Sequence, residues 1–135
     1  MVQRFTEKAD KDGITIHLDA KQPITVRCDK VRIEQVLTNL ISNAMKYGNG
    51  KPIDVKVSTH GQTAKISIKD HGIGISKEQK ERIFNLFERG VGNGEFKGLG
   101  IGLYISNQIV KAHSGNVSVQ SRPQQGAEFI VEIPM

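Results

Sequence analysis

The sequence of 135 residues contains one cysteine, Cys28, and no tryptophan. A single cysteine excludes an intrachain disulfide and a cysteine-built zinc site, and it suits a reducing compartment. No apolar run reaches the roughly 20 residues that a membrane-spanning helix needs, and the charged residues 1–13 lack the apolar core of a signal peptide. The net charge is +5, but the basic residues do not form the aromatic-interleaved clusters of a nucleic-acid surface. We therefore expect a cytoplasmic domain, attached or not to a membrane-anchored parent, that contacts neither nucleic acid nor membrane.

The spacing of apolar residues predicts an α+β fold. Alternating apolar and polar residues predict strands at 14–18, 24–26, 53–57, 64–69, 116–120 and 129–133. Three-four spacing predicts a long helix from a cap at Asp29 to Gly48, a short helix after Ser76, and a second long helix over 99–113. Strands do not alternate one for one with helices, so a doubly wound parallel sheet is not expected. We expect one domain over 14–135: a two-layer α/β sandwich with a mixed, mostly antiparallel sheet and helices on one face.

Amide side chains on the first long helix are the first candidates for binding chemistry. Asn39, Asn43 and Lys46 are spaced at i, i+4 and i+7, so they share one helix face, opposite the apolar one. Asparagine is a mediocre helix former, so a face that meets only water would favour Glu, Lys or Gln. Amide oxygens suit Mg²⁺, and a lysine one turn further on is placed to meet a phosphate. An ordinary solvated helix face is the alternative.

Two glycine-rich segments are the second and third candidates. Asp70 ends a predicted strand, and Gly72 and Gly74 follow it at a spacing that lets a ligand approach the backbone. A tight turn would need the same residues. The glycines of 98–102 run into the second long helix, whose first N–H groups form an anion site, with a hinge as the alternative. Neither segment fits the dinucleotide-binding fingerprint or the P-loop pattern.

In chain order, these features resemble the catalytic, ATP-binding domain of sensor histidine kinases, within the gyrase–Hsp90–histidine kinase–MutL superfamily. The four segments similar to the N, G1, F and G2 boxes of that family are 38–47, 70–74, 84–89 and 98–103. Residues 115–134 are similar to its last hairpin. The resemblance covers nearly the whole chain from Ile14 and implies a Bergerat-type ATP-binding fold with ATP and Mg²⁺ as ligands.

The resemblance also implies roles for single residues around the phosphates. Asn43 would hold Mg²⁺, Asn39 would assist around the phosphates, and Lys46 would contact one of them. The segment 88–97 would be the lid over the nucleotide, with Arg89 reaching the γ-phosphate. Asn39, Lys46 and Arg89 are thus the expected catalytic residues.

On the base side, the resemblance implies that Asp70 accepts a hydrogen bond from the adenine amino group and that Tyr47 lines the pocket nearby. Ala127 stands where the family often has Ser or Thr close to this network. The other expected nucleotide contacts are Gly72, Gly74, Ile75, Phe87, Gly98, Leu99, Gly100, Gly102 and Leu103.

The activity implied is donation of the γ-phosphoryl group to a histidine on a dimerisation helix, with a response regulator downstream. The family's acceptor histidine precedes an acidic residue, and none of the four histidines here does: His17, His60, His71 and His113. We therefore expect the acceptor helices to be absent, residues 1–13 to be an N-terminal segment or linker from them, and the isolated chain not to phosphorylate itself. Asn39 stands where ATPase members carry a glutamate base, so little hydrolysis is expected.

Two other functions compete with this interpretation. A stand-alone serine kinase of the anti-sigma-factor type shares the superfamily and the size, although the F-box-like segment argues against it. A degenerate nucleotide-binding module that only holds a partner would not need Asn43, Asp70 and the three glycines of 98–102. Nucleotide binding separates the degenerate module from the two kinases, and the identity of the phosphoryl acceptor separates the kinases from each other.

Overall fold

A mixed five-stranded sheet forms one layer of the domain in the computed structural model, which describes residues 13–20, 28–48, 50–75, 99–121 and 124–135. The strand order is β1-β2-β3-β5-β4. β1 runs parallel to β2, and every other neighbouring pair is antiparallel. The predicted mixed, mostly antiparallel sheet is confirmed, and the predicted strand at 24–26 lies outside the described residues.

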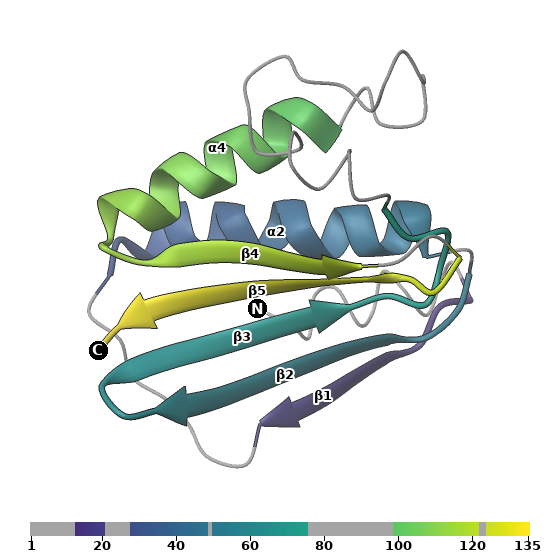
Figure 1. The fold of residues 1–135 in the computed structure, drawn as a ribbon, viewed down its shortest axis with the longest axis horizontal. Coiled ribbons are helices and arrows are strands. Elements are labelled where there is room, and N and C mark those ends of the chain that lie inside the picture. Colours follow the sequence, from purple (N-terminus) through teal and green to yellow (C-terminus); the bar gives the residue numbers. More distant parts are fainter. Residues whose placement is uncertain (1–12, 21–27, 49, 76–98, 122–123) are drawn as a thin grey trace.

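The strands and helices follow the predicted positions closely (Figure 1). The first long helix begins after Asp29, whose side chain accepts a hydrogen bond from the backbone N–H of Arg32, as an N-cap should. β2 and β3 form the predicted hairpin, and the second long helix starts at the predicted residue, Leu99. The elements of the described residues are β1 (Ile16–Ala20), α2 (Lys30–Tyr47), β2 (Ile53–His60), β3 (Thr63–Lys69), α4 (Leu99–Ala112), β4 (Asn116–Ser121) and β5 (Ala127–Pro134).

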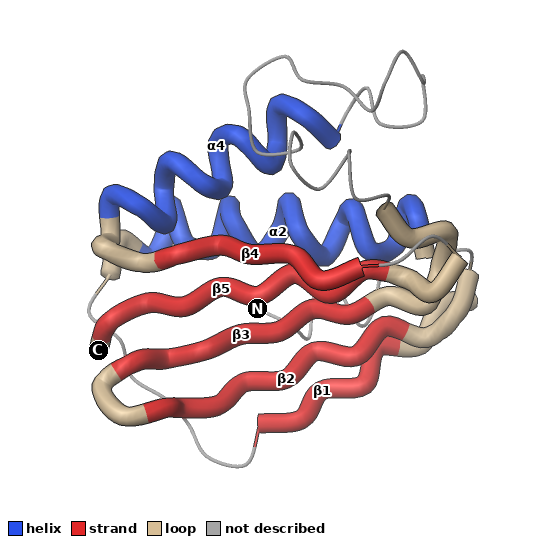
Figure 2. The backbone as a smooth tube through the Cα atoms, in the orientation of Figure 1, coloured by secondary structure: helices blue, strands red, loops and turns tan. Residues whose placement is uncertain are grey.

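The two helices form the second layer, and the core lies between them and one face of the sheet (Figure 2). Alternate residues of β5 point into this core, where Phe129, Val131 and Ile133 are buried. From α2 come the residues predicted by the three-four spacing, with Val36 and Leu40 fully buried. α4 contributes Leu103, Ile109 and Val110. Removing a buried leucine or isoleucine of this kind typically costs about 2–5 kcal/mol.

The sheet topology places two distant parts of the chain at the same end of the domain. β3 ends at Lys69, and its antiparallel neighbour β5 begins at Ala127, with Lys69 paired to Glu128. β4 ends at Ser121, which pairs with Ala127. The residues that follow β3 and the residues 124–126 that precede β5 therefore meet at one end of the sheet, and this end carries the candidate site.

Candidate functional site

Asp70 directly follows β3 and is 4% exposed, although it is an acidic residue. Its Oδ1 accepts two backbone hydrogen bonds, from the N–H of Gly72 at 3.0 Å and the N–H of Ala127 at 3.2 Å. No described residue hydrogen-bonds its second oxygen, Oδ2. Two fixed donors thus orient the carboxylate and leave one oxygen to receive a donor from another molecule.

Burial is the main electrostatic influence on this carboxyl group and raises the pKa of Asp70 above its ordinary value of 3.8. The two backbone N–H donors and the neighbouring His71 act in the opposite direction, but more weakly. A buried carboxylate is costly unless it is paired or hydrogen-bonded. A donor brought by a ligand would therefore find a strong, poorly hydrated acceptor at Oδ2.

Residues 70–75, called here the Asp70 segment, are joined by backbone hydrogen bonds to residues 124–127, called here the β5 turn. Asp70 N–H donates to the Ala127 carbonyl at 2.9 Å, and Gly126 N–H donates to the Gly72 carbonyl at 3.1 Å. Gln124 N–H donates to the Ile73 carbonyl at 2.7 Å. These bonds hold two segments more than 50 residues apart in the sequence as one unit.

Glycine is favoured at two positions of this unit. Gly74 and Gly126 have φ values of +72° and +80°, which residues with a side chain rarely adopt. A Cβ on Gly126 would also lie 2.1 Å from the Asp70 carbonyl oxygen. The tight approach of the β5 turn to Asp70 therefore depends on the absence of a side chain at 126.

The C-terminal end of α2 lies against the same aspartate. Gly48 follows α2, and a Cβ there would lie 3.5 Å from Cβ of Asp70. Lys46 and Tyr47 are the last two residues of α2 and directly precede Gly48. Asn43, which is partly buried, lies one turn earlier on the same helix.

Asn39 contacts α4 instead of facing away from the core. Its side chain is partly buried, and its Nδ2 donates to Oγ of Ser106 at 3.3 Å. Ser106 is fully buried on α4. The prediction that Asn39 lies opposite the apolar face was therefore wrong: the residue lies at the boundary where α2 packs on α4, and this contact accounts for its departure from an ordinary solvated face.

Some of the remaining predicted nucleotide-binding residues lie among the described residues, and others lie outside them. Ile75 is buried, and Leu103 is fully buried in the core. Leu99, Gly100 and Gly102 belong to the first turn of α4, where backbone N–H groups have no partner within the helix. Outside the described residues lie Phe87, Arg89, Gly98, the short helix after Ser76 and the lid segment 88–97.

Three further residues make contacts at this site that could not be predicted from the sequence. Ser121, at the end of β4, accepts a hydrogen bond from Ile75 N–H and donates one to the Gly126 carbonyl. Ser106 contacts Asn39, and His71 contacts Asp54 of β2 through Nε2 at 2.9 Å. Each partner is distant in the sequence, so only the pairing of strands and helices reveals these contacts.

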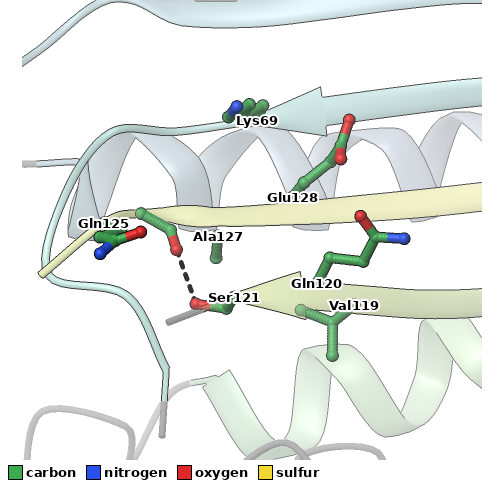
Figure 3. A pocket seen from close by; sticks show the side chains of 8 residues that line it. Lys69, Val119, Gln120, Ser121, Gln125, Ala127 and Glu128 are labelled. Atoms are coloured by element: carbon green, nitrogen blue, oxygen red, sulfur yellow. Dashed lines mark hydrogen bonds between the residues drawn. The ribbon is translucent and has the colours of Figure 1, made fainter. Parts of the chain in front are cut away.

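A hollow of about 390 Å³ lies at the same end of the sheet (Figure 3). Its lining includes the in-register residues Lys69, Glu128 and Gln120, together with Ser121 and Gln125. It includes no predicted nucleotide contact. Among the described residues, no group of three or more His, Cys, Asp or Glu side chains is arranged to hold a metal.

The family described as "Histidine kinase-, DNA gyrase B-, and HSP90-like ATPase" matches residues 28–135, which is most of the chain. The chain belongs to this family. Sensor histidine kinase RcsC of Escherichia coli K12 is 33% identical over 126 residues, covering 91% of this chain. Phytochrome-like protein Cph1 of Synechocystis is 35% identical over 131 residues, covering 96% of it.

Solved structures agree with this assignment. The nucleotide-free catalytic domain of histidine kinase ThkA has a TM-score of 0.84 and 30% identity, covering 98% of this chain and 86% of its own. Full-length ShkA in complex with AMPPNP has a TM-score of 0.83 and 30% identity, covering 98% of this chain and 28% of its own. Our chain is the catalytic ATP-binding domain of a sensor histidine kinase, and the predicted α+β sandwich is confirmed.

The chain spans a small part of its curated relatives, for example 13% of RcsC and 17% of Cph1. Among the described residues, no helix is long and apolar enough to cross a membrane. The expectations about the acceptor helices, the linker and the cell compartment concern the rest of the parent protein and stay predictions.

Proposed function

We propose that this domain binds Mg-ATP, identifies the adenine through Asp70, and donates the γ-phosphoryl group to a histidine on a dimerisation helix outside this chain. A response regulator would then receive the phosphoryl group. The observation that carries the proposal is the Asp70 carboxylate, which is buried, has one oxygen bound by two backbone donors, and has a second oxygen that no described residue engages. The exocyclic amino group of adenine is a donor of the kind this second oxygen needs.

The residues on α2 suit the phosphate end of the nucleotide. Asn43 is a neutral oxygen ligand for Mg²⁺, which binds proteins through few side chains and takes its other ligands from phosphates and water. Mg²⁺, when bound, would neutralise part of the phosphate charge. Lys46 would add a positive charge in the last turn of α2, and the N–H groups that open α4 would face the anion. Arg89 is proposed to complete this set from the lid.

The chemistry at position 39 favours transfer over hydrolysis. An amide cannot take a proton from water, so Asn39 supplies no general base. During transfer, the bond between the γ-phosphorus and the oxygen of ADP breaks as a bond to the imidazole nitrogen forms. The four histidines of this chain lack the acidic neighbour of the family's acceptor, so the proposed acceptor lies on another part of the parent protein.

The adenine proposal is tested by calorimetric titration with ATP and ITP in the presence of Mg²⁺. ITP carries a carbonyl where ATP carries the amino group, so it offers Asp70 no donor at that atom. A hydrogen bond to a charged group contributes about 1.5–3 kcal/mol, so ATP should bind about 10- to 150-fold more tightly than ITP.

Asp70→Asn should invert this preference. The N–H groups of Gly72 and Ala127 require an oxygen at the Oδ1 position, so the new amide nitrogen must occupy the position of Oδ2. That nitrogen donates, which suits the ITP carbonyl and repels the amino group of ATP. Asp19→Asn, an exposed change on β1 with the same loss of charge, is the matched control and should keep the ATP preference. Equal binding of ATP and ITP by the wild type would refute the proposal.

A further inference from the structure

We propose that Ser121 is a positioning residue for adenine recognition, because its hydroxyl fixes the direction of the Ala127 N–H, one of the two backbone N–H groups that orient Asp70. The inference rests on the proposed function of Asp70. Ser121 is the last residue of β4, is partly buried, and is not among the residues proposed to contact the nucleotide. Its effect would pass through the peptide bond between Gly126 and Ala127.

The Ser121 hydroxyl both accepts and donates a hydrogen bond, and so joins two segments. Its Oγ accepts the N–H of Ile75, 46 residues away, at 2.7 Å. It donates its own proton to the Gly126 carbonyl at 2.6 Å, the bond drawn as a dashed line in Figure 3. Because the Ile75 N–H occupies a lone pair of the oxygen, the hydroxyl proton is directed toward Gly126.

The Gly126 carbonyl belongs to the same peptide group as the Ala127 N–H. A peptide group is planar, and its C=O and N–H point in opposite directions in the trans form. No cis peptide bond occurs among the described residues, so the group is trans. Holding the Gly126 carbonyl therefore also fixes the direction of the Ala127 N–H, which donates to Asp70 Oδ1 at 3.2 Å.

This restraint matters because Gly126 is a glycine with φ +80°. Glycine has the widest choice of backbone conformations, so the peptide group that follows it has little intrinsic preference for one direction. The Gly126 N–H is held by its hydrogen bond to the Gly72 carbonyl. The Gly126 carbonyl is held by its hydrogen bond from Ser121. Without the hydroxyl, the Ala127 N–H would lose a restraint on its direction, and its hydrogen bond to the Asp70 carboxylate would weaken.

The test compares Ser121→Ala with Ser121→Thr, which keeps the hydroxyl, and with Ser118→Ala, a partly buried control on the same strand. Titration with ATP and ITP should show the ATP preference reduced about tenfold or more in Ser121→Ala, the loss expected for one fixed donor. Ser121→Thr and Ser118→Ala should keep the wild-type ratio. A merely structural role would lower the melting temperature of Ser121→Ala but leave the ratio unchanged in the folded protein, and this result would overturn the inference.

A second readout needs no nucleotide. Amide hydrogen exchange of the free domain should show faster exchange at Ala127 in Ser121→Ala, with the amides of the central strands β3 and β5 still protected. Unchanged exchange at Ala127 would also overturn the inference. If Ser121→Ala fails to fold, Ser121→Cys, which keeps the size but is a weak donor, takes its place in both measurements.

The two proposals fail in different ways. A wild-type domain that binds ATP no more tightly than ITP refutes the role of Asp70 in adenine recognition. A wild type that prefers ATP, together with a Ser121→Ala variant that keeps the same preference and the same Ala127 exchange, refutes only the role of Ser121.

Discussion

Replacing Gly126 by alanine tests the close contact between the β5 turn and the Asp70 segment. Two costs add at this position. The φ of +80° costs a residue with a side chain about 1–2 kcal/mol. The new Cβ would also lie 2.1 Å from the Asp70 carbonyl oxygen and 2.8 Å from Cα of His71. Both neighbours are backbone atoms, so the two segments must separate.

Separation would weaken the hydrogen bonds from Gly126 N–H to Gly72 and from Ala127 N–H to Asp70, each contributing about 1 kcal/mol. We therefore expect Gly126→Ala to lower the free energy of unfolding by about 3–4 kcal/mol. Gly61→Ala is the matched control, because Gly61 has a φ of +62° in the β2–β3 turn but no atom within 4 Å of its Cβ position. It should cost about 1 kcal/mol, which is the conformational part alone.

Urea unfolding followed by circular dichroism gives both values from the transition midpoints. Titration of Gly126→Ala with ATP should also show weakened binding, while Gly61→Ala should bind as the wild type does. Equal losses of stability in the two variants would refute the argument, because the contact at Asp70 would then contribute nothing beyond the backbone conformation.

Three other predictions concern pH and the helix contacts. Because burial raises the pKa of Asp70, the folded state binds this proton more tightly than the unfolded state, and the contribution of Asp70 to stability is lost as pH rises from 3.8 through the raised pKa. In urea titrations, the free energy of unfolding of Asp70→Asn should therefore increase relative to that of wild type as the pH rises above 3.8. A difference between the two proteins that does not change with pH would contradict the raised pKa. Ser106→Ala should lower stability by about 1 kcal/mol through the lost bond to Asn39, and an unchanged urea midpoint would argue against that bond. His113 accepts a hydrogen bond from the Asp29 N–H through Nε2 at 3.0 Å, and its Nδ1 bonds the Ile109 carbonyl. His113→Ala should therefore lower the melting temperature by a few degrees. An unchanged melting temperature would argue that this link between α2 and α4 does not stabilise the domain.

Most of the fold could be predicted from local patterns in the sequence. Three-four spacing identified α2, and the polar cap at Asp29 placed its first residue. Alternation identified the β2–β3 hairpin because its two strands are neighbours in the chain. The parallel pairing of β1 with β2 and the position of β5 between β3 and β4 were not predictable in this way. Those pairings depend on long-range packing and leave no local signal.

The candidate site likewise has local features that the sequence indicates and long-range contacts that it does not. Asp70 and its glycines form a local motif, so the sequence indicated them. The donors that orient Asp70 come partly from Ala127, 57 residues away, and the hydroxyl behind them comes from Ser121. A single serine or alanine at a strand end carries no recognisable signal. The orientation of Asn39 was predicted wrongly because helix periodicity gives the position of a side chain around the axis of its own helix. It does not show where a second helix packs against that helix.

Thermal unfolding with and without ATP and Mg²⁺ tests the central claim most directly, with wild type and Asp70→Asn measured side by side. ATP at a hundred times its dissociation constant should stabilise the wild type by about 2.7 kcal/mol, and the melting temperature should rise by several degrees. At the same concentration the Asp70→Asn domain should fold but show little shift, because its amide presents a donor to the adenine amino group. A wild type that shows no shift at ATP concentrations on the order of millimolar, or an Asp70→Asn domain that shifts as far as the wild type, would contradict the account.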